Sequence, residues 1–173
     1  MASAEPVYLP VEDLNAQSFA PFGDVIEAHE TARQFAINQG FATRFHDLAL
    51  IDAGKGEGVR VLVNIFRAIP RRLPMQLQVM ERHPLGSQAF VALAERPFLV
   101  VVAAPTEALL PQQIRCFLAR PGQGVNYARG VWHHPLIALE SASDFLVIDR
   151  GGPEGEHNLD EIDIAHWGVW AGT

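Results

Sequence analysis

Short strand-like segments, separated by turn residues at near-regular intervals, constrain the fold of this chain more than any other feature. Each segment has the length of a β-strand, and several are rich in β-branched and aromatic residues. Glycine and proline cluster between them, as in RHPLG and RPGQG. This pattern predicts a mostly β fold, a closed or sandwiched antiparallel architecture with a few short helices. The segments are DVIEA, VRVLVNIF, QLQVME, QAFVAL, FLVVVAA, IRCFLA, LIALE and DFLVID.

Two stretches carry more specific predictions. FLVVVAA (98–104) is apolar on both faces, which is typical of a central strand. In VEDLNAQSFAPFG (11–23), apolar residues recur at rough helical spacing before a proline and a glycine, which predicts a short amphipathic helix. No change of composition marks a domain boundary, so we expect one domain over residues 1–173.

Charge and cysteine content exclude several classes of protein. The net charge is −7 and no basic cluster is larger than Arg71–Arg72, which disfavours a nucleic-acid partner. The N-terminal MASAEPVYLPVEDL lacks the features of a secretory signal, and no apolar run is long enough to span a bilayer. The only cysteine, Cys116, excludes a disulfide framework and is interpreted as a small buried hydrophobe. We therefore expect a cytoplasmic protein that is not bound to a membrane.

The segment QLQVMERH (76–83) places polar side chains at the end of an apolar strand face. Because side chains alternate along a strand, Glu81 and His83 share the face that begins apolar and is expected to point inward. After a short turn, Gln88 opens the next strand. A hairpin here would bring Glu81, His83 and Gln88 together at one mouth of a barrel.

A second cluster of imidazole lies in GQGVNYARGVWHHPL (122–136). If this stretch is extended, His133 and His134 point to opposite sides, so only one of them faces the interior. We interpret His133 as the inward residue and His134 as structural or as part of an interface.

The spacing Glu81-x-His83-x4-Gln88, followed later by Gly130-x-x-His133, resembles the two-part metal-binding motif of cupin barrels. In this chain Glu81 stands where that motif has a histidine, Gln88 where it has a glutamate, and an alanine where it has a proline. Two imidazoles and one carboxylate still suit a first-row divalent metal, with Gln88 as a weak fourth ligand. Either half of the motif alone is more often structural than functional. Their order and their separation by several strands strengthen the functional interpretation.

Five segments carry a resemblance to a known family: APFGDVIE, INQGFATRFHDLA, ERHPLGSQAFVAL, GQGVNYARGVWHHPL and DFLVIDRGG. Through them the chain resembles the ureidoglycolate lyase family across nearly its whole length. The resemblance implies a cupin-like β-barrel, usually a homodimer, that acts in allantoin and purine-nitrogen breakdown by splitting (S)-ureidoglycolate into glyoxylate and urea. It also implies assistance by a metal, with nickel the ion named for the family.

This reaction places definite demands on the side chains. A base must take the hydroxyl proton while the C–N bond breaks, which we assign to a centre of Glu81, His83 and His133. A small anionic substrate also calls for a cation, and arginine is best because its planar fork binds both carboxylate oxygens. Arg67 shares a strand face with three β-branched residues and is expected to point inward. The remaining candidates for substrate contacts are Gln88, Asn126 and Tyr127.

Other functions remain open at this point. One is an amidohydrolase that releases ammonia from the same substrate. Another is a non-catalytic cupin that senses a small metabolite, although no output domain is visible in 173 residues. A metal-dependent isomerase or dioxygenase would need a fuller set of histidine and carboxylate ligands.

Overall fold

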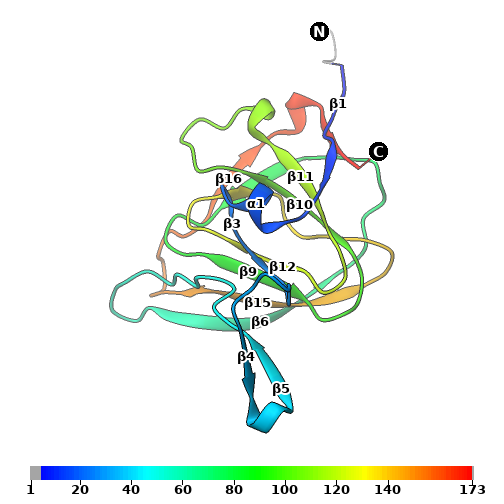
Figure 1. Ribbon diagram of the computed structural model, residues 1–173. Helices are drawn as coiled ribbons and strands as arrows, with labels where there is room; N and C mark the ends of the chain where they lie inside the picture. Colours follow the sequence, from blue (N-terminus) through cyan, green and yellow to red (C-terminus); the bar gives the residue numbers. More distant parts are fainter. Residues whose placement is uncertain (1–4, 173) are drawn as a thin grey trace.

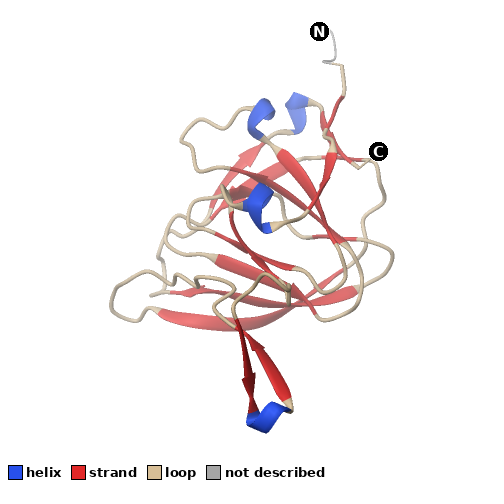
Figure 2. Cartoon of the chain, viewed as in Figure 1, coloured by secondary structure: helices blue, strands red, loops and turns tan. Residues whose placement is uncertain are grey.

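The computed structural model describes residues 5–172 and consists mainly of strands, with one short α-helix and three 3-10 turns (Figure 2). The helical elements are α1 (Ala16–Phe19), η1 (Asn38–Gly40), η2 (Pro111–Gln113) and η3 (Ala165–Trp167). The strands are β1 (Val7–Tyr8), β2 (Val11–Asp13), β3 (Gly23–Ile26), β4 (Gln34–Ile37), β5 (Ala42–Phe45), β6 (Arg60–Ala68), β7 (Met75–Gln76), β8 (Val79–Arg82), β9 (Gln88–Ala92), β10 (Phe98–Ala103), β11 (Arg115–Ala119), β12 (Gly124–Tyr127), β13 (Trp132–His133), β14 (Ile137–Ala138), β15 (Ser143–Gly151), β16 (Asp160–Asp163) and β17 (Val169–Ala171).

Two large sheets form the body of the molecule. One has the order β16-β8-β13-β10-β11-β2, with β14 also paired to β10, and the other has the order β3-β12-β9-β15-β6. Neighbouring strands are antiparallel except that β2 runs parallel to β11 and β1 parallel to β17. The mostly β, antiparallel prediction is confirmed, whereas closure of the sheets into a barrel stays a prediction. None of the described helices is long and apolar enough to cross a membrane.

The main core lies between the two large sheets. It includes Phe90 and Phe145 from one sheet and Phe98 and Phe117 from the other, all 5% exposed or less. A second core covers the opposite face of β10, where Leu99 and the neighbouring buried residues pack against the small sheet β1-β17-β7. Every residue of β10 is buried, so the prediction of a central strand is confirmed.

The helix predicted over residues 11–23 is shorter than expected. Val11–Asp13 forms the edge strand β2 instead, and only Ala16–Phe19 is helical. Asn15 caps this turn, because its side-chain oxygen accepts a hydrogen bond from the Ser18 amide at 2.9 Å. Phe19 from the turn is fully buried, which is the amphipathic feature that the sequence pattern reported.

The facing of β6 differs from the prediction. Val61, Val63 and Ile65 are 50%, 67% and 55% exposed, so the β-branched face of this strand points outward. Phe66, on the other face, approaches Phe90 in the main core with ring centroids 6.0 Å apart. Arg67 therefore does not point inward as expected, because it shares the outer face with the β-branched residues.

A hairpin of β4 and β5 projects from the same side of the molecule as β6 and β15 (Figure 1). This segment, residues 34–45, is called the arm below. Its tip carries Phe41, which is 89% exposed, and its strands carry the part-exposed Phe35 and Ile37. The sequence analysis did not predict the arm as a hairpin.

Candidate metal and active site

Two paired strands place the central side chains opposite each other. In the antiparallel pair of β8 and β13, His133 stands directly across from Glu81. Side chains of directly opposed residues lie on the same face of a sheet. His83 follows β8 and, two residues beyond Glu81, lies on the same side.

Three of the four predicted ligands converge. Each of Glu81, His83 and His133 offers one ligand atom, and these three atoms lie within 4.8 Å of one another. The Nε2 atom of His133 is 3.4 Å from Oε1 of Glu81, and the ring centroids of the two histidines are 5.3 Å apart. Tyr127 stacks on His133 with a centroid distance of 4.5 Å and holds that ring in place. The predicted convergence of residues about fifty positions apart is confirmed.

Hydrogen bonds on the far side of each ring leave one nitrogen of each histidine free for a ligand. Nδ1 of His133 donates to the Val131 carbonyl at 3.1 Å, and Nδ1 of His83 donates to the Asn158 carbonyl at 2.8 Å. A carbonyl only accepts, so a neutral ring carries its proton on Nδ1 and keeps a lone pair on Nε2. Metal-binding histidines are held in this way.

The acceptor atoms of the site that have no hydrogen-bond donor suit a cation. Nε2 of His133 is buried and lacks a hydrogen-bond partner among residues 5–172. Nε2 of His83 faces Oε1 of Gln88 at 3.1 Å, so two acceptor atoms meet there when the ring is neutral. Together with the Glu81 carboxylate, these lone pairs form a nitrogen and oxygen donor set that suits a first-row divalent metal.

The electrostatics of the site follow from its burial. Burial opposes ionisation of Glu81, but the neighbouring imidazole of His133, whose Nε2 lies 3.4 Å from the carboxylate, outweighs it, so the pKa of Glu81 lies below its ordinary value. Burial, together with the charge of Glu81, raises the pKa of Tyr127, and its hydroxyl stays protonated. Burial lowers the pKa of His134, which is 5% exposed and donates from Nδ1 to the Pro135 carbonyl. These contacts support a structural role for His134.

A pocket of about 410 Å³ opens beside this cluster. Glu81, Gln88 and Arg67 line it together with Phe66, Phe90 and the 135–136 segment. This volume is ample for a small hydroxy acid. A larger hollow of about 950 Å³ lies near the base of the arm, but none of the three converging residues lines it.

The predicted substrate-binding residues lie in different positions relative to the pocket. Arg67 reaches the pocket from its rim, where Nε and Nη2 donate to the Asp144 carboxylate at 2.7 and 2.9 Å. Tyr127 is buried in the main core, where it stacks on His133 and is not among the residues that line the pocket. Asn126 lies on the opposite face of β12 and donates to Asp24 and to the Leu50 carbonyl, so the expectation that it points to the substrate is corrected.

Sequence reasoning missed two polar residues beside the pocket. Asp149, on β15, accepts a hydrogen bond from Gln88 Nε2 at 3.2 Å and another from Asn64 Nδ2 at 3.1 Å. Asn64 lies on the inner face of β6. The sequence did contain a signal for both residues, because each is a polar residue that interrupts an otherwise apolar strand. That signal indicates a site only when the inward face of each strand is known.

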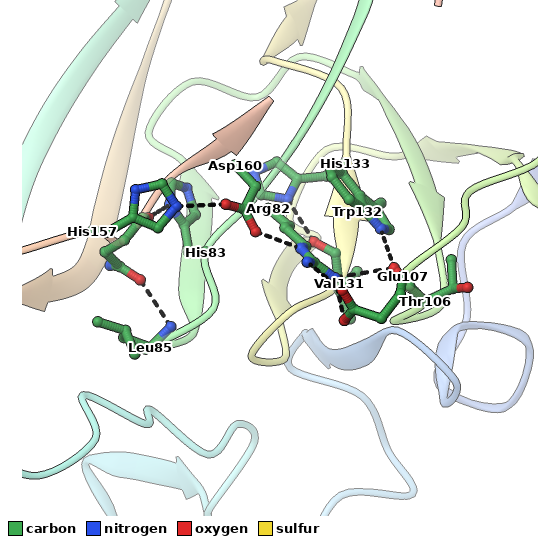
Figure 3. A network of polar contacts seen from close by, with 11 residues as sticks. Arg82, His83, Leu85, Thr106, Glu107, Val131, Trp132, His133, His157 and Asp160 are labelled. Atoms are coloured by element: carbon green, nitrogen blue, oxygen red, sulfur yellow. Dashed lines mark hydrogen bonds and ion pairs between the residues drawn. The ribbon is translucent and has the colours of Figure 1, made fainter. Parts of the chain in front are cut away.

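The outer faces of the same strands carry a supporting network. Arg82, next to Glu81, points away from the pocket as predicted and donates to Asp160 at 2.8 Å and to the Thr106 carbonyl at 3.0 Å (Figure 3). Its guanidinium lies 4.7 Å from the ring centroid of Trp132, the residue before His133. The contact between Arg82 and Trp132 therefore holds β8 and β13 together on the side away from the pocket.

Comparison with known proteins agrees with this geometry. The family model described as ureidoglycolate lyase matches residues 6–169. The chain belongs to the ureidoglycolate lyase family. The family resemblance stated from the sequence is thereby confirmed.

Curated ureidoglycolate lyases from several bacteria are similar over most of their length. One from Burkholderia mallei (strain NCTC 10229) is 56% identical over 159 residues, 92% of each chain. One from Burkholderia cepacia is 54% identical over 162 residues, 94% of this chain and 89% of the relative. One from Brucella ovis is 56% identical over 153 residues, 88% of each chain.

The single cysteine lies in the core, away from the candidate site. Cys116 is fully buried in β11, and burial raises the pKa of its thiol to about 12. A thiol with this pKa is not a nucleophile at neutral pH. The interpretation of Cys116 as a small buried hydrophobe is confirmed.

Proposed function

We propose that the protein is a carbon–nitrogen lyase that cleaves (S)-ureidoglycolate to glyoxylate and urea in the breakdown of allantoin and purine nitrogen. The observation that carries the proposal is the convergence of Glu81, His83 and His133 beside a pocket, in a chain whose relatives are named ureidoglycolate lyase. We further propose that this chemistry takes place in the cytoplasm.

The reaction is a balanced elimination. The carbinol hydroxyl loses its proton, and the electrons of that O–H bond form the carbonyl of glyoxylate as the C–N bond breaks. The departing urea nitrogen takes up a proton, so no co-reactant is consumed. Glu81 and the Nε2 atoms of His83 and His133 are placed to hold or move these protons. Such proton transfer contributes ~100- to 10,000-fold to the rate.

The same side chains would hold a divalent metal, with Gln88 as a fourth donor, and the family resemblance points to nickel. When bound, the metal acts as a Lewis acid that lowers the pKa of the substrate hydroxyl. The buried, unpartnered Nε2 of His133 and the facing acceptors of His83 and Gln88 support this assignment.

Arg67 is proposed to bind the substrate carboxylate at the rim of the pocket. Its Nη1 atom forms no hydrogen bond to any described residue, whereas Nε and Nη2 are engaged by Asp144. Tyr127 supports the site by packing against His133 and closing one wall to water.

The assembly is proposed to be a homodimer. The exposed residues Val61, Val63 and Ile65 belong to β6, and β6 lies on the same side of the molecule as the arm (Figure 1). A contiguous apolar face of this kind marks a protein interface. A two-fold arrangement would bring each such face against its copy, with each arm alongside the partner.

A product assay tests the proposed function directly. Racemic ureidoglycolate is incubated with the protein, and urea, glyoxylate and ammonia are measured. We expect equal amounts of urea and glyoxylate, with half of the racemate consumed. Ammonia in place of urea would show an amidohydrolase, and binding without turnover would show a sensor; either result overturns the proposal.

A further inference from the structure

Asp149 is a half-buried carboxylate next to Gln88, which lines the pocket, and it forms no ion pair with any described residue. It follows Phe145 and Val147 on the inner face of β15, and both of those residues are buried in the main core. Its only side-chain partners within residues 5–172 are two amides, with Asn64 on one oxygen and Gln88 on the other. Each carboxylate oxygen accepts about two hydrogen bonds, so each has room for one more donor.

Gln88 links this carboxylate to the proposed metal ligands. Its Oε1 faces Nε2 of His83 at 3.1 Å, and its Nε2 donates to Asp149 at 3.2 Å. A side-chain amide nitrogen has two hydrogens, so one N–H of Gln88 remains free. Beside the metal ligands, the pocket wall thus offers an N–H donor next to a carboxylate acceptor.

A ureido group has the complementary pattern, a carbonyl oxygen flanked by N–H donors. We propose that Asp149, held in position by Asn64, accepts hydrogen bonds from the ureido N–H groups of the substrate, while Gln88 donates to the ureido carbonyl. This inference rests on the proposed function and names the residue that recognises the urea half of the substrate.

The negative charge of Asp149 also orients the substrate. The substrate carboxylate is repelled by Asp149 and is directed toward Arg67 at the rim of the pocket and toward the metal-ligand cluster, which meets the pocket at Glu81. The neutral ureido end is then the end that meets Asp149. Glyoxylate lacks a ureido group, so its binding does not depend on Asp149.

The test compares two ligands that do not react. N-carbamoylglycine has the ureido group and the carboxylate but no hydroxyl, so this elimination cannot cleave it. Glycolate has the hydroxyl and the carboxylate but no ureido group. Binding of both is measured by isothermal titration calorimetry on the metal-loaded protein, for the wild type and for Asp149→Asn.

We expect Asp149→Asn to bind N-carbamoylglycine at least tenfold more weakly and glycolate within twofold of the wild type, because hydrogen bonds to charged groups are the strong ones. Asp47→Asn is the matched control. Asp47 is exposed near the base of the arm and has a positive φ of 57°, a conformation that asparagine tolerates. This control removes the same charge and leaves both affinities unchanged.

Three results would overturn the inference: no N-carbamoylglycine binding by the wild type, unchanged binding by Asp149→Asn, or equal loss of both ligands. If Asp149→Asn does not fold, Asn64→Ala tests the same point, because it releases Asp149 and weakens N-carbamoylglycine binding alone. The inference stands apart from the proposed function. Ureido binding through Asp149 without urea release would reject the lyase assignment, whereas urea release without this dependence would reject the inference.

Discussion

His133 gives the clearest sign that the site suits a cation. Its Nε2 atom is buried without a hydrogen-bond partner among the described residues, and its other nitrogen is fixed by the Val131 carbonyl. A buried polar atom left unpaired costs about 1–3 kcal/mol. One cation between His133, Glu81 and His83 would remove this cost.

Replacement of His133 by alanine separates this role from folding. We expect His133→Ala to lower urea release by at least ~100-fold, because it removes a ligand and a proton-transfer group together. Nickel retained after dialysis, measured by mass spectrometry, should fall in parallel. Circular dichroism should show a folded protein, because the strand β13 and its pairing with β8 depend on backbone hydrogen bonds.

His166→Ala is the matched control, since His166 is exposed and lies in η3, outside the metal-ligand cluster. It should leave urea release and bound nickel unchanged. Unchanged urea release in His133→Ala would reject His133 as part of the active centre. Full activity of the wild type after exhaustive chelation would reject the metal and leave acid–base chemistry alone.

Strand β8 shows how much of the site a local pattern can predict. Period-two alternation placed Glu81 and His83 on one face and Arg82 on the other, and the structure has all three as predicted. The pattern extended too far toward the N-terminus, because Leu77 lies outside β8 and packs in the second core. Alternation is reliable only where the chain stays in one strand.

Strand β6 shows where sequence reasoning failed. Its β-branched residues form the more apolar face, so alternation alone assigned that face to the interior. Because Arg67 shares that face, it was also predicted to point inward. The inner face instead carries Asn64, which pairs with Asp149 next to the pocket-lining Gln88. Hydrophobicity predicts the buried face only where that face packs on a core, and a strand that borders a pocket can carry polar residues on its inner face.

The ion pair that links β2 to β11 predicts a pH-dependent contribution to the stability of the fold. Nε and Nη2 of Arg115 hold Glu12 at 2.9 and 2.5 Å, and this hydrogen bond outweighs burial, so the pKa of Glu12 lies below its ordinary value. A lowered folded-state pKa stabilises the fold above the ordinary pKa, and this contribution is lost as pH falls through the folded-state pKa.

Glu12→Gln should therefore lower the free energy of unfolding at pH 7 by about 1 kcal/mol or less, as both side chains are part-exposed. The difference from the wild type should shrink below about pH 4. Urea unfolding at pH 7, 5 and 3 measures it, with Glu154→Gln in an exposed turn as the control. A difference that grows as pH falls would contradict the assignment.

At the scale of the whole molecule, the arm and the outer side of the β3-β12-β9-β15-β6 sheet share one property, because both expose apolar residues. The arm packs mainly on itself through the β4–β5 ladder, yet its tip places Phe41 in solvent. The family-specific segment INQGFATRFHDLA lies largely within it. Its exposed apolar residues and those of β6 lie on one side of the molecule, which is the arrangement expected of a surface that a second copy covers (Figure 1).

A charge on this surface should dissociate the proposed homodimer. Val63 is 67% exposed, so Val63→Glu leaves the monomer folded, but in a dimer the new carboxylates would be buried without a partner. We expect light scattering after size exclusion to give a dimer for the wild type and a monomer for Val63→Glu, with a dimer dissociation constant raised at least ~100-fold. Val7→Glu, at the 51% exposed Val7 of β1 toward the opposite end of the molecule in Figure 1, should remain dimeric. A monomeric wild type, or a Val63→Glu variant that is still fully dimeric, would show that this face is not the interface.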